Sequence, residues 1–269
     1  MNQLSFLGVA GLFVIPMIIV LVPIFIGQYY GIYRSKKKPE ELQRESVGTA
    51  VGAAFALLAF MLAFTFQIAT DRYNTRKELL LDEVTNIRTA YLRAGLLPEP
   101  FRSDSKKLLA EYVDIRADFA NDGTKLNTLL ARSPEILNIL WGYTEGLAEQ
   151  DRSSEVYALF TQSVNDLVDN YNHRITMSLE YRIPLVILWI LFIIAFLSFL
   201  TLGYQFGISG KGSFMINLML AIVFAVVMFL ILTLDRPETG VARLNQKPVI
   251  ALQKQVQEMQ LKVHTNVLK

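Results

Sequence analysis

The residues best suited to a functional role lie on one face of an apolar segment between residues 47 and 70. Small and weakly polar side chains interrupted by one aromatic ring recur there at helical spacing: Thr49, Gly52, Ala56, Phe60, Ala63, Gln67 and Thr70. Small residues let helix backbones approach closely, so tight packing is one interpretation. The other is the wall of an aqueous pore, in which Gln67 and Thr70 offer hydrogen bonds and Phe60 is an apolar constriction that gates by dewetting. The segments of one chain cannot enclose a wide aqueous path, so a pore requires a homo-oligomer.

The run from Asp71 to Arg76 follows this segment, where a pore would have its mouth, and its charged residues are Asp71, Arg72 and Arg76. Repeated as rings in an oligomer, Asp71 would attract cations, whereas Arg72 or Arg76 would attract anions. Local pairing of Asp71 with Thr75 or Arg76, its neighbours on a helix, is the alternative. The sequence leaves these readings open.

The sequence carries few residues that could support enzyme chemistry. The chain has no cysteine, and its two histidines, His173 and His264, have no metal-ligand spacing. Phosphate-binding and nucleophile motifs are missing, and we interpret Asp82 and Glu83 as part of a solvated helix face. We therefore predict a protein that is not an enzyme and holds no metal or cofactor. A net charge of +2 also gives no reason to expect nucleic acid as a partner.

The distribution of charge shows which elements position the pore face. Residues 1–33, 46–70, 183–210 and 212–234 contain no Asp, Glu, Lys or Arg. A helix needs roughly 20 apolar residues to cross a bilayer, so each stretch is long enough. The sequence predicts four membrane spans, with the lipid bilayer as main partner, and Asn217 in the fourth predicts an interhelical hydrogen bond.

The 112 residues from Asp71 to Arg182 predict a helical bundle outside the membrane. Apolar residues recur there at alternating steps of three and four, as in Leu80, Val84, Ile87 and Tyr91. We expect an all-α protein in which two helices run unbroken into the second and third spans, although Pro184 could kink the latter junction. The expected parts are spans 1 and 2 (1–70), the helical domain (71–182), spans 3 and 4 (183–234) and a tail (235–269).

The tail carries an amphipathic helix, and its partner is open at this stage. Val249, Leu252, Val256, Met259 and Val263 form an apolar seam that could pack on the chain's own domain or on another subunit. Membrane orientation is open as well, because basic residues flank the spans on both sides.

Several short motifs make the sequence similar to a known family. They are Ala59 to Phe66, Asp71-Arg72-Tyr73, Glu83 to Arg93, Leu97-Pro98-Glu99-Pro100 and Leu234-Asp235-Arg236-Pro237. With these motifs the chain resembles the bestrophin-like family of bacterial and plant membrane proteins. Its layout of two spans, a helical domain and two spans also resembles true bestrophins, which are pentameric anion channels with a cytoplasmic helical domain.

The resemblance implies an oligomeric channel for small inorganic anions such as chloride, lined by the second span, with Phe60 and Phe64 as its neck. It also implies a pentamer in the bacterial inner membrane with the helical domain in the cytoplasm. One departure is that no acidic cluster matches a bestrophin calcium site. A membrane signalling or scaffold protein, whose helical domain binds a partner or ligand, is the alternative to the channel.

Overall fold

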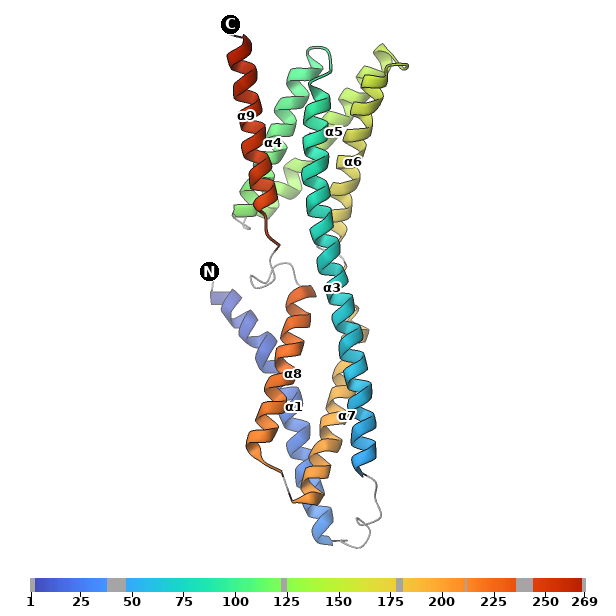
Figure 1. The fold of residues 1–269 in the computed structure, drawn as a ribbon, viewed down its shortest axis with the longest axis vertical. Helices are drawn as coiled ribbons and strands as arrows, with labels where there is room; N and C mark the ends of the chain where they lie inside the picture. Colours follow the sequence, from blue (N-terminus) through green and yellow to red (C-terminus); the bar gives the residue numbers. More distant parts are fainter. Residues whose placement is uncertain are drawn as a thin grey trace. The chain divides into compact units, whose positions relative to one another are not determined.

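In the computed structural model, nearly the whole chain is helical. It describes residues 3–37, 47–121, 125–177, 181–210, 212–235 and 244–267, and no β-strand occurs in these ranges. The prediction of an all-α protein is confirmed. The helices, shown in Figure 1, are α1 (Gln3–Lys37), α3 (Val47–Ala94), α4 (Phe101–Asn121), α5 (Leu126–Gln150), α6 (Glu155–Ile175), α7 (Leu185–Ser209), α8 (Phe214–Asp235) and α9 (Lys247–Val267).

Four of these helices can cross a membrane. The most apolar stretches of α1, α3, α7 and α8 have mean hydropathies of 2.7, 2.2, 2.9 and 2.9, and each helix is long enough to span the hydrocarbon layer. The predicted four-span arrangement is confirmed, and the chain is a membrane protein.

The contacts within the chain define two units. The membrane unit comprises Met1–Asn74 and Tyr181–Arg243, and the helical unit comprises Thr75–Glu180 and Leu244–Lys269. Helix α3 contributes its first part to the membrane unit and its second part to the helical unit.

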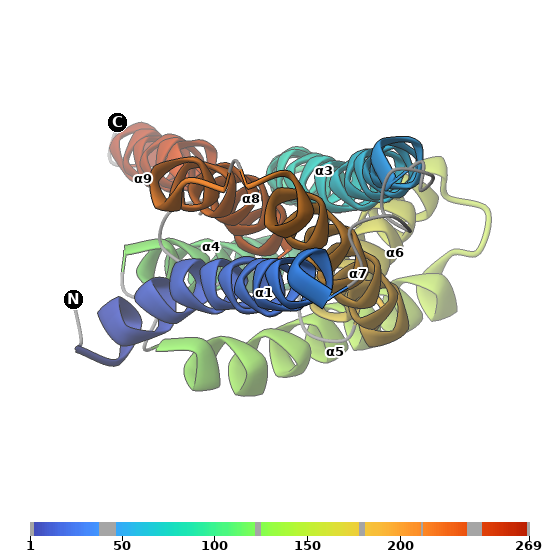
Figure 2. The same ribbon diagram turned by 90° about the horizontal axis from the view of Figure 1, so that it is seen from below.

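Within the membrane unit, α1 and α7 pack with their backbones in close contact. Gly27 and Gly31 of α1 face Gly203 and Gly207 of α7, and a Cβ atom added at Gly203 would overlap the carbonyl oxygen of Ile24. Glycines four residues apart on both helices allow this approach. Figure 2 shows α1 lying beside α7 and α8.

Aromatic rings and polar side chains join the remaining spans. The ring of Phe199 on α7 packs edge-on against Phe55 of α3 and Phe224 of α8, with centroid distances of 5.2 and 5.5 Å. The Asn217 amide on α8 donates a hydrogen bond to Gln28 Oε1 on α1 at 3.3 Å, which confirms the predicted interhelical contact.

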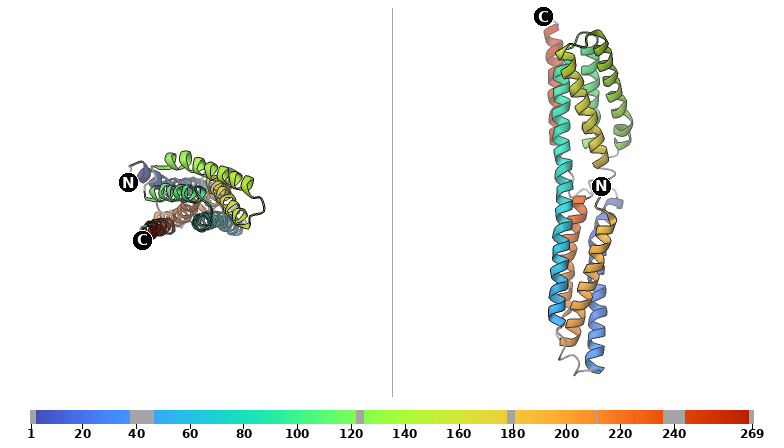
Figure 3. Two further views of the ribbon diagram at one scale, coloured as in Figure 1. Left: turned by 90° about the horizontal axis from the view of Figure 1, so that it is seen from above. Right: turned by 90° about the vertical axis from the view of Figure 1, so that its right-hand side faces the viewer.

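The helical unit has its own apolar core, to which the tail helix contributes. Leu252 and Val256 of α9 are 2% exposed and lie in the same cluster as Tyr112, Leu140 and Phe160. Helix α9 lies beside α4 (Figure 1 and Figure 3), and Gln253 Nε2 donates to Asp114 Oδ1 at 2.8 Å. Of the two readings of the tail, the structure therefore supports packing on its own unit.

We predicted that two helices of the helical domain continue into spans. The prediction is confirmed for one helix and wrong for the other. Helix α3 runs unbroken for 48 residues. Helix α6, however, ends at Ile175, residues 181–184 are not helical, and α7 begins after Pro184. Proline lacks the N–H that a helix needs and disfavours helical geometry in the residue before it. The Asp235 carboxylate accepts a hydrogen bond from the Ile183 N–H at 3.0 Å, so tertiary structure satisfies this backbone group instead.

Candidate functional site: the exposed face of helix α3

Helix α3 has two different faces in the membrane unit. Val51, Leu58, Thr65 and Ala69 are buried against the other spans, at most 7% exposed. They follow one another at steps of seven, seven and four residues, so they share one side of the helix. This apolar side attaches α3 to the unit and leaves the opposite side at the surface of the protomer.

The predicted pore face coincides with this exposed side. Phe60 is 66% exposed, and Phe64, at its edge, is 50% exposed. Thr70, at the end of the span, is partly buried. The other members of the predicted face are all exposed: Thr49, Gly52, Ala56, Ala63 and Gln67.

The exposed surface of α3 differs in chemistry from that of the other spans. It carries glycine, alanine, threonine and glutamine residues together with a few large apolar ones such as Phe60 and Phe64. The other three spans expose large apolar side chains, including Ile18, Phe25, Trp189, Ile193, Met219 and Val223. Only 11% of the most apolar stretch of α3 is buried, against 28, 22 and 33% for α1, α7 and α8. Lipid-facing surfaces are strongly apolar, so the α3 face is typical of a contact with protein or water.

The charged residues after the span lie on different sides of α3. Gln67 Nε2 donates a hydrogen bond to Asp71 Oδ1 at 2.8 Å, which holds the carboxylate on the exposed face. Arg72 is partly buried. Arg76 is 5% exposed and comes nine residues after Gln67, about two and a half turns, which puts it on the opposite side. Gln67, one turn earlier, is thus a hydrogen-bond partner of Asp71. Local pairing of Asp71 with Thr75 or Arg76 stays a prediction.

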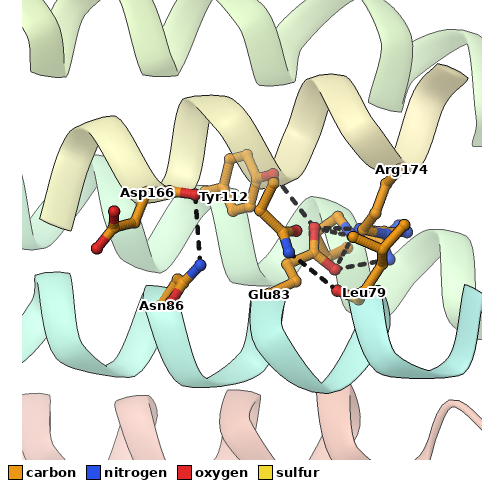
Figure 4. Close-up of polar contacts among 8 residues, drawn as sticks. Leu79, Glu83, Asn86, Tyr112, Asp166 and Arg174 are labelled. Carbon is orange, nitrogen blue, oxygen red and sulfur yellow. Dashed lines mark hydrogen bonds and ion pairs between the residues drawn. The ribbon is translucent and has the colours of Figure 1, made fainter. Parts of the chain in front are cut away.

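A buried ionic cluster in the helical unit was missed at the sequence level. The Glu83 carboxylate on α3 accepts hydrogen bonds from Arg116 Nε at 2.9 Å and from the Tyr112 hydroxyl at 3.2 Å, both on α4. Arg174 on α6 forms an ion pair with the same carboxylate. Figure 4 shows the Tyr112 and Arg174 side chains pointing at Glu83. The Glu83 and Arg116 side chains are each 1% exposed, so the interpretation of Glu83 as part of a solvated face was wrong.

The electrostatics of the cluster keep Glu83 ionised. Burial by itself would raise the pKa of Glu83, but the charges and hydrogen bonds of Arg116 and Arg174 lower it below its ordinary value. Burial raises the pKa of Tyr112, which therefore stays a hydrogen-bond donor. Two guanidinium groups and one carboxylate leave this part of the core with a net charge of +1.

A sequence signal for this cluster exists. Glu83 follows Leu80 by three residues and precedes Ile87 by four, so it lies inside an apolar stripe of α3. Arg116 similarly lies between Val113 and Ala117 on α4, which are both buried. A charged residue within such a stripe is expected to be buried and paired.

The helical unit also contains a groove of about 630 Å³ between the end of α3, α4 and α9. Its walls include Tyr91, Ser103, Lys106, Lys107 and Gln257. The Lys106 ammonium lies 5.4 Å from the centroid of the Tyr91 ring. Residues of the predicted pore face and its mouth are not among those that line it.

Comparison with known proteins identifies the family. A family model described as "Bestrophin-like domain" matches residues 18–249, which include the second part of α1, the other three spans and most of the helical unit. The chain belongs to the bestrophin-like family. No curated protein sequence matches it.

This bestrophin-like chain is similar to solved structures of a bacterial protein. Two crystal structures of a bestrophin homologue from Klebsiella pneumoniae, each with a single substitution, superpose with TM-scores of 0.65 and 0.68. They are 16 and 15% identical in sequence and cover 90 and 92% of this chain and 98 and 97% of theirs. At this identity the similarity shows a shared fold.

The structure also gives a role to two residues of the short motifs that carry the resemblance to the bestrophin-like family. Glu83, within the stretch that carried the resemblance, is the centre of the buried cluster, and Asp235 binds the backbone before α7. Arg236 and Pro237 lie outside the described residues.

Proposed function

We propose that this bestrophin-like protein is a homo-oligomeric ion channel in which α3 of each subunit lines the pore. The observation that carries the proposal is the chemistry of the α3 face, which is exposed in the protomer and is richer in small and polar residues than the exposed surfaces of the other spans. In an oligomer, Thr49, Gly52, Ala56 and Ala63 form the wall, and Gln67 and Thr70 offer hydrogen bonds.

Phe60, with Phe64 one turn later, forms the neck of this pore. An exposed aromatic ring on an otherwise small-residue face narrows the path at one level, and an apolar constriction gates by losing its water. Asp71 and Arg72 lie near the mouth. The resemblance to true bestrophins supports a pentamer in the bacterial inner membrane, with the helical unit in the cytoplasm and selectivity for small anions such as chloride.

Single-channel recording of the purified protein in planar bilayers tests the proposal. We expect discrete openings and a higher basal conductance for Phe60→Ala, because the substitution removes the constriction. Phe196→Ala is the matched control, since Phe196 is an exposed ring on α7, another span. A folded oligomer that stays silent across pH, calcium and voltage would refute the channel, and equal currents for Phe60→Ala and the parent would remove Phe60 from the gate.

A membrane signalling or scaffold role is the second candidate, and the groove in the helical unit favours it. The groove combines two lysine ammonium groups with an aromatic ring and amide side chains, which suits an anionic ligand. In a scaffold, the α3 face would be a dry contact between protein helices. Water accessibility of a cysteine placed at Ala56 separates the two functions, because a pore leaves it reactive toward a water-soluble thiol reagent.

A further inference from the structure

The groove between the end of α3, α4 and α9 has a positively charged wall. Lys106 and Lys107 on α4 line it, and none of the other described residues that line it is acidic. In the part of the chain that the structure describes, neither ammonium group forms an ion pair with a carboxylate. A volume of about 630 Å³ is typical of small-molecule sites. Two unpaired cations beside such a hollow favour an anionic ligand.

Tyr91 adds a buried hydrogen-bond donor to the same groove. It is 2% exposed, and what remains open of its side chain faces the groove that it lines. Among the described residues, its hydroxyl has no hydrogen-bond partner. Burial raises the pKa of Tyr91, so the hydroxyl stays protonated and can donate. Buried polar groups are nearly always paired, and an acceptor oxygen of a ligand would pair this one.

The Tyr91 ring also positions one of the lysines. Lys106 Nζ lies 5.4 Å from the ring centroid, so cation–π attraction holds the ammonium group beside the ring. The carbonyl groups in the last turn of α3 are already paired with backbone N–H groups of the following loop, as in the Gly95 N–H donating to Leu92 O at 3.1 Å. The Lys106 ammonium therefore keeps its hydrogen-bonding capacity for a ligand.

The acidic residues around the groove do not cancel its charge. Those closest to the lysines act on side chains that do not line the groove: Glu99 lies 3.9 Å from Arg102, Asp104 raises the pKa of Tyr143, and Glu111 pairs with Arg132 at 2.7 Å. Lys107, one turn before Glu111, interacts with it through charge without an ion-pair contact. On α9, Lys254 and Glu258 are exposed one turn apart and balance each other.

We propose that this groove binds a small organic phosphate, whose phosphate group contacts Lys106, Lys107 and the Tyr91 hydroxyl. A phosphate monoester carries about −1.5 to −2 charges at pH 7 and has three strong acceptor oxygens, which match two ammonium groups and one hydroxyl. The organic part lies against Gln257 and Gln260, which line the groove from α9 and offer amide donors and acceptors. Binding at this site does not require a pore.

Titration calorimetry of the purified full-length protein in detergent tests the site, with AMP and glucose 6-phosphate as probes and inorganic phosphate for comparison. We expect saturable binding of at least one organic phosphate, at one site per chain and more tightly than inorganic phosphate. Lys106→Gln is expected to weaken binding at least about tenfold, because it removes a charge-assisted hydrogen bond. Tyr91→Phe keeps the ring but removes the donor, and is expected to weaken binding about fivefold.

Lys77→Gln is the matched control, because it removes an exposed lysine of α3 that does not line the groove and is expected to leave the affinity unchanged. Circular dichroism checks that each variant keeps its helical fold. The proposal is overturned if neither organic phosphate binds saturably, if Lys106→Gln and Lys77→Gln bind with equal affinity, or if sodium chloride at the same ionic strength gives the same heats. Currents in planar bilayers are a separate readout, so failure of this site leaves the channel in place.

Discussion

Removal of the charge of Glu83 is expected to destabilise the helical unit strongly. The Glu83 carboxylate is the one acidic group that Arg116 and Arg174 share, and it is 1% exposed. Glu83→Gln keeps the size of the side chain but removes the negative charge that the buried Arg116 and the partly buried Arg174 share. Breaking a buried ion pair by removing one partner costs about 3–5 kcal/mol.

Substitutions of Glu83 and of Arg116 are not expected to have equal effects, because the cluster has two cations and one anion. Glu83→Gln changes its net charge from +1 to +2, whereas Arg116→Met changes it to zero and leaves the pair of Glu83 with Arg174. Methionine is a flexible apolar side chain that can fill much of the space that arginine occupied. We therefore expect Glu83→Gln to be the more damaging substitution.

The two tryptophans of the chain allow a measurement specific to one unit. Trp141 lies on α5 in the helical unit, and Trp189 lies on α7 in the membrane unit. In a Trp189→Phe background, intrinsic fluorescence during heating in detergent reports on Trp141. A loss of 3–5 kcal/mol corresponds to a decrease in Tm of roughly 10–20 °C for a unit of this size.

Glu111→Gln is the control for the loss of a surface carboxylate. Glu111 pairs with Arg132 at 2.7 Å, but both side chains are well exposed, so its loss is expected to leave Tm within error of the parent. The reasoning is refuted if Glu83→Gln lowers Tm by no more than Glu111→Gln does, or if Arg116→Met proves the less stable of the two cluster variants.

Three further predictions concern pH, helix packing and helix propensity. The folded-state pKa of Glu83 is below its ordinary value of 4.5, so the stability that the ionised carboxylate contributes is fully present above pH 4.5 and is lost as pH falls through the folded pKa. The difference in Tm between the parent and Glu83→Gln, read at Trp141, should therefore shrink between pH 5 and pH 3. A constant difference would argue against an ionised Glu83. Gly203→Val places methyl groups against the Ile24 carbonyl and should destabilise the membrane unit, seen as a lower Tm at Trp189 in a Trp141→Phe background. Gly142→Ala, where an added Cβ meets no atom within 4 Å, should instead stabilise α5 by about 0.5–1 kcal/mol, so a loss of stability there would contradict the steric argument.

The elements that the sequence predicted well are those with a long-range regular pattern. The four charge-free stretches predicted the spans because a bilayer excludes charge over a fixed thickness. The exposed face of α3 could be predicted because helical periodicity alone brings Thr49, Gly52, Ala56 and Phe60 to one side. The break before α7 was harder to predict, since Pro184 is compatible with either a kink in a continuous helix or the end of one helix. Which of the two occurs depends on the groups that satisfy the freed backbone hydrogen bonds.

The amino-acid sequence by itself determined that this is an all-helical, four-span membrane protein with one span unlike the others, because hydropathy and periodicity are local properties of a chain. Tertiary structure decided which charges are buried and which are exposed. Glu83, Arg116 and Arg174 come from three helices far apart in the sequence and meet only when those helices pack. In the same way, Asp71 and Arg76 are close in sequence, but packing buries Arg76 and leaves Asp71 on the exposed face. Burial depends on all the neighbours of a side chain at once, and a pattern along one helix does not contain that information.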